Sequence, residues 1–383
     1  MCKRRLAILF GGRSAEHEVS LLSASCVAAA VDLQRFVPLY IGITKEGSWK
    51  RYQGPPELAA REISTGTWQE RALAFAAADL AKEADFALPL LHGPYGEDGC
   101  IQGFLETLGL PYGGCGVLAS AVSMDKQIFK QLMKEKGLPV CDFLSFTRAE
   151  LARDVSGAAW RIKNRLGLPC FIKPANMGSS VGISKAGTEA ELVQAFALAC
   201  RYDDKIVAEE YIDARELEIA FLGGKLGGGK LCLSPIGEIL PACEFYDYRA
   251  KYGSGREAGR EDGRKDGRKD GREAPAGETQ SGASKLLIPA PLEESTALRI
   301  RDLAAAAFEA VDGYGFGRAD FFVEKGTGNI YINEINTIPG FTAGSMFPLL
   351  WQAAGLSVRE IIERIVDLGY ERDHLRNNRH TAV

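Results

Sequence analysis

The sequence has 383 residues, with 46 basic and 50 acidic side chains and a hydrophobic fraction of 46%. This length predicts two or three packed domains, and the hydrophobic fraction is sufficient to fill their cores. A net charge of −4 provides no basic field for nucleic acid. Nine cysteines, an odd number without metal-binding spacing, predict free thiols in a reducing cytosol.

The amino terminus places three basic residues before a short hydrophobic run. Leu6 to Phe10 are too few residues for the hydrophobic region of a signal peptide, and no other stretch is long enough to cross a membrane. We therefore expect a soluble, cytoplasmic protein without a membrane partner.

Short hydrophobic runs separated by helical segments predict a mostly parallel α/β sheet in the first hundred residues. Ser14 is the expected N-cap of the first helix. The glycine-rich stretch from His92 to Gly99 follows a strand's carboxyl end, where open α/β sheets place ligands. The predicted strands are residues 6–10, 36–43 and 86–91.

A second helix is predicted near residue 125, and a domain boundary between about 115 and 120. Ser123 is its expected cap, Asp125 lies in its first turn, and Gly137 ends it. Its apolar stripe consists of Ile128, Phe129, Leu132 and Met133. From about residue 169 onward, the pattern changes to short strands and tight turns.

A strand ending in Lys173 leads into a loop of small residues from Gly178 to Gly182. Backbone amides of Gly and Ser can approach phosphate oxygens closely, and a lysine supplies positive charge. No helix follows, and the lysine precedes the glycines, so this is not a P-loop. The alternative is an ordinary hairpin turn, which is our interpretation of Gly227 to Lys230.

The next hydrophobic strand, from Ile206 to Ile212, ends in acidic residues, and Glu216 and Glu218 follow it. Carboxylates can accept hydrogen bonds from an adenine amino group or from ribose hydroxyls. From this stretch alone, an amphipathic strand with exposed acids is the favoured interpretation.

Residues 253–285 contain a near-repeat of Gly, Arg, Lys, Asp and Glu with almost no large apolar side chain. Such a composition cannot bury enough surface to order itself, and we interpret it as a flexible excursion from a loop. The alternative is a basic stripe for nucleic acid, but interleaved Asp and Glu cancel the charge of Arg.

Two alternating runs around a glycine turn predict a β-hairpin over residues 317–336. Pairing symmetric about Thr327 would place Asp320 opposite Glu334 and Arg318 opposite Asn336. The residues then expected on one face are Arg318, Asp320, Phe322, Ile332, Glu334 and Asn336.

Opposed carboxylates destabilise a sheet unless positive charge lies between them. Mg²⁺ takes carboxylate and amide oxygens and keeps contact with substrate phosphates. The hairpin therefore predicts a metal site at Asp320 and Glu334. The alternative is a solvated hairpin, which the Pro-Gly turn directly after Asn336 disfavours.

In this order, the motifs resemble the ATP-grasp superfamily and, within it, the D-alanine–D-alanine ligase family. The resemblance spans nearly the whole chain and implies an α/β ATP-grasp fold. It divides the chain into a Rossmann-like domain (1–116), a small central subdomain (117–209) and a catalytic subdomain (210–383). The residues that carry it are 11–20, 91–99, 123–126, 172–174, 178–182, 245–252, 317–320 and 333–342.

The resemblance implies an ATP-dependent ligation of two D-alanine molecules for peptidoglycan synthesis. It also implies that the enzyme uses two Mg²⁺ or Mn²⁺ ions and is a homodimer. For the ATP phosphates it implies Lys126 and Lys173, covered by a loop of Gly178, Ser179 and Ser180. For adenine it implies Glu209, Glu210 and Ile212, and for ribose it implies Glu216. For the metals it implies Asp320, Glu334 and Asn336.

For the first D-alanine, the resemblance implies Glu16 at the ammonium group, with His92 near it. It implies lid contacts from Ser179, Lys251 and Tyr252, an oxyanion site of Arg318 and the Gly340 amide, and the second D-alanine's carboxylate at Ser345 and Met346. The lid would span Phe245 to Leu287. This sequence departs from the family by placing the repeat directly after Tyr252, and we expect the lid residues to function with the repeat in solvent.

Three alternatives remain. A D-alanine–D-lactate ligase would lack the Tyr-Asp-Tyr and Lys-Tyr pattern of residues 246–252. A Rossmann-type oxidoreductase would need a GxGxxG motif and an acidic residue about twenty positions later, and Gly11-Gly12 has neither. A catalytically silent nucleotide-binding module is disfavoured because no expected lysine or carboxylate is missing.

Overall fold

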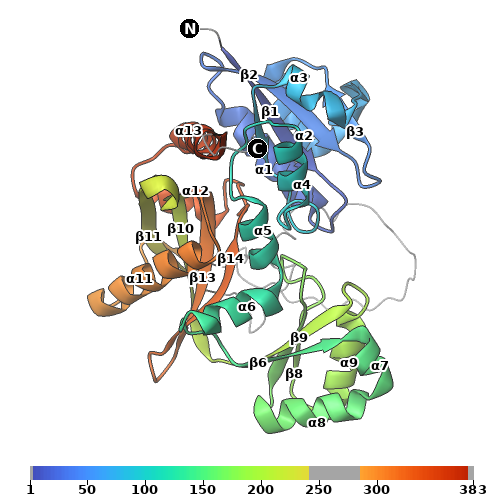
Figure 1. Cartoon of the computed structure of the whole chain (residues 1–383), viewed down its shortest axis with the longest axis vertical. Coiled ribbons are helices and arrows are strands. Elements are labelled where there is room, and N and C mark those ends of the chain that lie inside the picture. Colours follow the sequence, from blue (N-terminus) through green and yellow to red (C-terminus); the bar gives the residue numbers. More distant parts are fainter. Residues whose placement is uncertain (1–2, 241–284, 378–383) are drawn as a thin grey trace, which may run out of the picture.

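The computed structural model describes residues 3–240 and 285–377 and contains three sheets (Figure 1). Lys251, Tyr252 and nearly all of the predicted lid and repeat lie outside the described residues. Within the described ranges, no helix is long and hydrophobic enough to cross a membrane. The described cysteines are free thiols, as predicted.

The first sheet has the order β4-β3-β2-β1-β5. Its elements are β1 (Arg4–Gly11), α1 (His17–Ala30), β2 (Phe36–Ile43), β3 (Trp49–Tyr52), α2 (Pro56–Thr65), η1 (Thr67–Arg71), β4 (Ala72–Ala74), η2 (Ala77–Asp79), α3 (Leu80–Glu83), β5 (Phe86–Pro89) and α4 (Cys100–Thr107). As predicted, β1, β2 and β5 are parallel. Alternate β1 residues enter different cores, because Ile8 packs with α1 and α2 whereas Leu9 packs with α3 and α4.

The second sheet is antiparallel with the order β6-β9-β7-β8. Its elements are β6 (Phe143–Thr147), α7 (Arg148–Arg153), α8 (Val155–Arg165), β7 (Cys170–Pro174), β8 (Ser184–Ala186), α9 (Glu189–Ala199) and β9 (Lys205–Glu210). Ile162 of α8 and Phe196 of α9 bury their side chains against Ile172 of β7 and Ile206 of β9. The opposite face of β7 and β9 is therefore available to carry polar side chains.

The third sheet has the order β12-β11-β10-β13-β14. The strands of this sheet and the accompanying helices are α5 (Val117–Met124), α6 (Lys126–Glu135), β10 (Ala214–Gly223), η3 (Leu226–Gly228), β11 (Leu231–Leu240), β12 (Lys285–Leu287), α11 (Glu294–Ala310), β13 (Gly315–Glu324), β14 (Ile330–Asn336), α12 (Met346–Ala353) and α13 (Val358–Asn377). Phe129 and Met133 of α6 share a core with Phe308 of α11 and Phe321 of β13.

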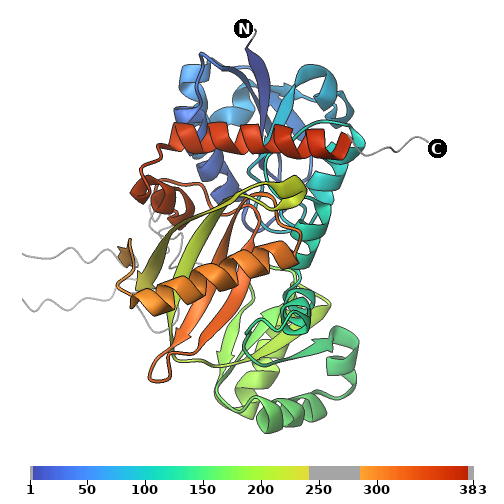
Figure 2. The same cartoon turned by 60° about the vertical axis from the view of Figure 1, so that its left-hand side comes forward.

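Helix α13 joins the first and third sheets (Figure 2). Its Ile362 and Ile365 are buried in the same core as Ile8 of β1 and Phe316 of β13. The carboxyl-terminal helix therefore fixes the first sheet against the third.

Two predicted helix caps are wrong. The first helix begins at His17 rather than after Ser14, whose Oγ accepts a hydrogen bond from Glu16 N at 3.0 Å in a turn before the helix. Ser123 lies inside α5, and Asp125 is the N-cap of α6, accepting hydrogen bonds from Gln127 N and Ile128 N. Sequence reasoning began this helix at Ser123 and did not predict α5.

Candidate active site

A cavity of about 320 Å³ lies between the second and third sheets. Strands β7 and β9 contribute one wall, and β10, β13 and β14 contribute the other. The predicted site residues that line it are Lys126, Lys173, Gly178, Ser179, Ser180, Glu209, Glu210, Ile212, Glu216, Asp320 and Glu334. Lysine and carboxylate side chains that are distant in the sequence therefore line the same cavity.

The β13–β14 hairpin has the predicted pairing at its carboxyl end. Asp320 is opposite Glu334, and Arg318 is opposite Asn336. Nearer the turn the prediction is wrong, because the register shifts after Asp320 and Phe322 pairs with Tyr331 instead of Ile332. The shift turns Ile332 into the apolar core, where it is fully buried.

Arg318 neutralises the acidic end of this hairpin. Its guanidinium donates two hydrogen bonds of 2.7 Å to the Asp320 carboxylate, and its Nε lies 2.9 Å from Glu218 Oε2. Glu218 is itself opposite Asp320 across β10 and β13. Burial lowers the pKa of Arg318, but Asp320 and Glu218 outweigh it and hold this pKa well above the ordinary value.

The oxygen set at this edge fits a hard divalent cation. Asp320 and Glu334 offer carboxylates, and Asn336 adds an amide whose Nδ2 donates to Asp320 Oδ2 at 3.1 Å. Carboxylate and amide oxygens are ligands of Mg²⁺ and Ca²⁺. Among the described residues, no three His, Cys, Asp or Glu side chains form a metal-binding cluster, and the predicted set combines two carboxylates with one amide.

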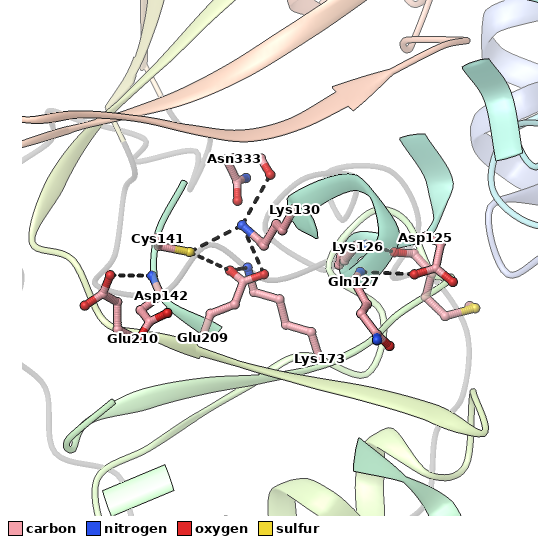
Figure 3. A network of polar contacts seen from close by, with 11 residues as sticks. Asp125, Lys126, Gln127, Lys130, Cys141, Asp142, Lys173, Glu209, Glu210 and Asn333 are labelled. Atoms are coloured by element: carbon pink, nitrogen blue, oxygen red, sulfur yellow. Dashed lines mark hydrogen bonds and ion pairs between the residues drawn. The ribbon is translucent and has the colours of Figure 1, made fainter. Parts of the chain in front are cut away.

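The opposite wall carries the two predicted phosphate lysines, Lys126 and Lys173 (Figure 3). Lys126 Nζ donates to Met177 O at 2.6 Å. Lys173 Nζ donates to Glu209 Oε2 at 2.7 Å, and Glu209 is only 2% exposed. Both lysines line the cavity together with Gly178, Ser179 and Ser180. The strand-lysine-loop pattern predicted this place for Lys173, and the family resemblance implied it for Lys126.

The small-residue loop reaches the first sheet's helix. Ser179 Oγ donates a hydrogen bond to Glu16 Oε1 at the amino end of α1. Ser179 and Ser180 have left-handed φ values of 48° and 61°, a conformation that non-glycine residues rarely adopt. A Cβ at Gly178 would lie 2.6 Å from Glu16 Oε2, so a larger residue here would require the Glu16 carboxylate to move.

His92 has a protein partner on each ring nitrogen. Nδ1 faces the Ile338 carbonyl at 3.0 Å and must donate to it, so Nε2 accepts from Ser23 Oγ at 2.9 Å. Ser23 Oγ in turn accepts from Phe341 N at 3.1 Å. Burial lowers the pKa of His92 to about 4, which keeps this imidazole neutral. The network fixes the loop that contains Gly340.

Family models and known proteins match this chain over nearly its full length. The D-ala D-ala ligase N-terminus model matches residues 5–115, and the D-ala D-ala ligase C-terminus model matches residues 132–262 and 277–367. The D-alanine–D-alanine ligase of Acetivibrio thermocellus is 42% identical, covering 97% of this chain and 96% of the relative. That of Geobacillus thermodenitrificans is 43% identical with the same coverage.

Solved structures agree. The D-alanine-D-alanine ligase of Coxiella burnetii has a TM-score of 0.79 and 30% identity, covering 98% of this chain and 96% of the other. The VanG D-Ala:D-Ser ligase of Enterococcus faecalis has a TM-score of 0.78 and 31% identity, covering 96% and 100%.

This chain belongs to the D-alanine–D-alanine ligase family. The predicted α/β ATP-grasp fold is thereby confirmed. The family models leave residues 263–276 unmatched, within the repeat that departs from the family pattern.

Met346, which the family resemblance places at the second D-alanine's carboxylate, has a buried side chain. It is 4% exposed and packs in the core between the first and third sheets. Its backbone lies in the first turn of α12. Ser345 is the residue before that helix, and its Oγ accepts from Thr342 N at 3.1 Å.

Sequence reasoning assigned no role to Glu97 or Lys130, both of which are buried. It considered Glu218 as a hydrogen-bond acceptor but favoured an exposed position, whereas Glu218 is 6% exposed. Glu97 accepts from Gly93 N and Ile338 N, and burial together with the nearby Glu16 raises its pKa to about 8. Alternation with Glu216 could have indicated Glu218. No sequence pattern indicated Lys130, because its position in a helix resembles a solvated face.

Proposed function

We propose that this protein ligates two D-alanine molecules to D-alanyl-D-alanine, converting ATP to ADP and phosphate, for peptidoglycan precursors. This proposal is supported mainly by the cavity that Lys126, Lys173, Asp320 and Glu334 line together. We further propose that it acts in the cytoplasm as a homodimer.

The lysine side of the cavity binds ATP in this proposal. Lys126 and Lys173 hold the phosphates beneath the amides of Gly178, Ser179 and Ser180. Glu209, the Glu210 and Ile212 backbone and Glu216 take the adenine and ribose. Phosphoryl transfer needs mainly positioning and charge neutralisation, which lysines and backbone amides supply.

The hairpin side holds the cations. Asp320, Glu334 and Asn336 would hold two Mg²⁺ or Mn²⁺ ions, which supply positive charge toward the phosphates when bound. Arg318 already balances Asp320 in this structure and lies beside it on β13. We propose that Arg318 and the Gly340 amide stabilise the oxyanion of the acyl-transfer step.

The D-alanine side lies at the amino end of α1. Glu16 takes the first substrate's ammonium, while Ser179 holds the Glu16 carboxylate, and Lys251 and Tyr252 add lid contacts. The first carboxylate attacks the γ-phosphorus, ADP leaves, and an acyl phosphate forms. The second amine then attacks the acyl carbon and phosphate leaves. Ser345 and the Met346 backbone bind the second carboxylate at the start of α12.

Product analysis tests this proposal. With ATP and Mg²⁺, D-alanine should support stoichiometric ADP, phosphate and dipeptide, whereas L-alanine should support none. Competition among D-alanine, D-serine and D-lactate then identifies the second substrate, since one structural relative carries a D-Ala:D-Ser name. Predominant formation of the D-serine or D-lactate product, or nucleotide turnover without any dipeptide, would refute the D-alanyl-D-alanine assignment.

A further inference from the structure

Lys130 of α6 is a fully buried cation behind the cavity wall, and it is not among the residues that line the cavity. Its Nζ lies 3.4 Å from Glu209 Oε1, 3.3 Å from Cys141 Sγ and 3.5 Å from Asn333 O (Figure 3). The ammonium group donates hydrogen bonds to Cys141 Sγ and Asn333 O and forms an ion pair with Glu209 Oε1. These neighbours therefore hold the Lys130 ammonium group in a fixed position.

The Glu209 carboxylate and the ammonium groups of Lys130 and Lys173 stabilise one another's charged forms. Burial raises the pKa of Glu209, but Lys130 and Lys173 outweigh it and lower this pKa to about 2. Burial also raises the pKa of Cys141 to about 11, so its thiol is neutral and donates toward Glu209 Oε2 at 3.6 Å. Glu209 is thus a buried carboxylate with two lysine counter-ions.

The two lysines differ in what else they can reach. Lys173 borders the cavity, whereas Lys130 does not. A nucleotide phosphate would compete with Glu209 for Lys173. Without a second cation, Glu209 would then be a buried charge without a counter-ion, which is strongly unfavourable.

We propose that Lys130 is a positioning residue that keeps Glu209 an ionised hydrogen-bond acceptor while Lys173 holds phosphate, and that it thereby sets the preference for a 6-amino purine. This inference rests on the proposed ATP site. A carboxylate only accepts hydrogen bonds, so it favours the adenine amino group and repels the guanine 6-oxo group. A protonated or displaced Glu209 loses this discrimination.

The primary test compares Lys130→Met with Lys134→Met. Lys134 lies one turn later on α6, is 43% exposed and pairs with Asp142 at 2.8 Å. Lys130→Met should raise KM for ATP by about 10- to 100-fold, as loss of a charged hydrogen bond does, with a smaller change in kcat. Its ratio of kcat/KM for ATP over GTP should fall, whereas Lys134→Met should match the wild type.

The Glu209→Gln variant distinguishes an error in the proposed role of Lys130 from an error in the proposed adenine contact of Glu209. If Glu209→Gln leaves KM for ATP and the ATP preference unchanged, the proposed adenine contact is wrong. If Glu209→Gln changes both but Lys130→Met behaves like Lys134→Met, the role of Lys130 is overturned. The double variant should match Glu209→Gln alone, because the two residues act as one unit.

Lys130→Gln keeps the test decisive if Lys130→Met does not fold. The amide still donates a hydrogen bond but carries no charge. A reduced ATP over GTP ratio in Lys130→Gln supports the inference, and a wild-type ratio in a folded Lys130→Gln protein contradicts it. Circular dichroism and thermal unfolding of the full chain establish folding for each variant.

Discussion

The hydrogen bond from Ser179 to Glu16 connects the small-residue loop after β7 to the first sheet's helix. It joins residues 163 positions apart and holds Ser179 in a left-handed backbone conformation. Backbone strain of this kind persists only where the surroundings impose it. The proposed ammonium site and the proposed phosphate loop are therefore coupled through one side chain.

Removing this hydroxyl tests that coupling. Ser179→Ala should lower kcat/KM for D-alanine by about 10- to 100-fold, because hydrogen bonds to a carboxylate contribute about 1.5–3 kcal/mol. Ser184→Ala, on the next strand and outside the cavity lining, is the matched control. Equal kcat/KM in both variants, measured by phosphate release, would show that the contact does not serve the site.

Residue-level prediction succeeded where local pattern decides the outcome. Alternation predicted the opposition of Asp320 and Glu334, which is confirmed, whereas the phosphate role of Lys173 stays a prediction. It failed for Lys130, because a buried ion pair depends on partners more than 70 positions away. Ile332 was misplaced because a register shift arises from packing against the core, which a symmetric hairpin pattern does not contain.

At the scale of elements, the loop from Ile338 to Phe341 is held by α1 and by the segment after β5. His92, Ser23 and Glu97 all contact its backbone. Sequence reasoning placed His92 near the substrate but could not show that both of its nitrogens are engaged. The partners come from segments about 70 and 246 positions away.

The buried His92 predicts a pH dependence of stability. Its folded-state pKa of about 4 lies below its ordinary 6.5, so the unfolded chain binds the proton first. Stability from this group is fully present above pH 6.5 and is lost as the pH falls toward 4, by about 3 kcal/mol at most. Urea unfolding of His92→Gln should show a shallower loss in this window. A slope equal to that of the wild type would contradict a neutral, buried His92.

At the scale of the whole molecule, the three sheets are connected by shared cores and by the cavity. Sequence pattern anticipated the parallel first sheet. The division into three parts with boundaries at 116 and 209, which the family resemblance implied, stays a prediction. The antiparallel strands β3 and β4 were not anticipated, because short, partly exposed strands have little hydrophobic pattern.

Helix α13 should stabilise the first and third sheets together. Ile365→Ala removes a fully buried side chain between them and should cost about 2–5 kcal/mol of unfolding free energy. Val193→Ala, at a position 46% exposed, should cost less than about 0.5 kcal/mol. Equal midpoints for both variants in denaturant unfolding would show that α13 contributes little to the packing.

We propose that Asp320 and Glu334 hold the cations that bind the nucleotide phosphates, and the rest of the proposed site depends on this role. The most direct test is phosphate release from ATP and D-alanine, titrated with Mg²⁺, for wild type, Glu334→Gln and Glu324→Gln. Glu324 lies on the same hairpin, is partly exposed and is not among the residues that line the cavity. We predict that Glu334→Gln loses turnover by about 100-fold or more, since charged active-site groups contribute several kcal/mol, and that Glu324→Gln retains it. A folded Glu334→Gln protein with wild-type turnover and Mg²⁺ dependence would contradict the claim.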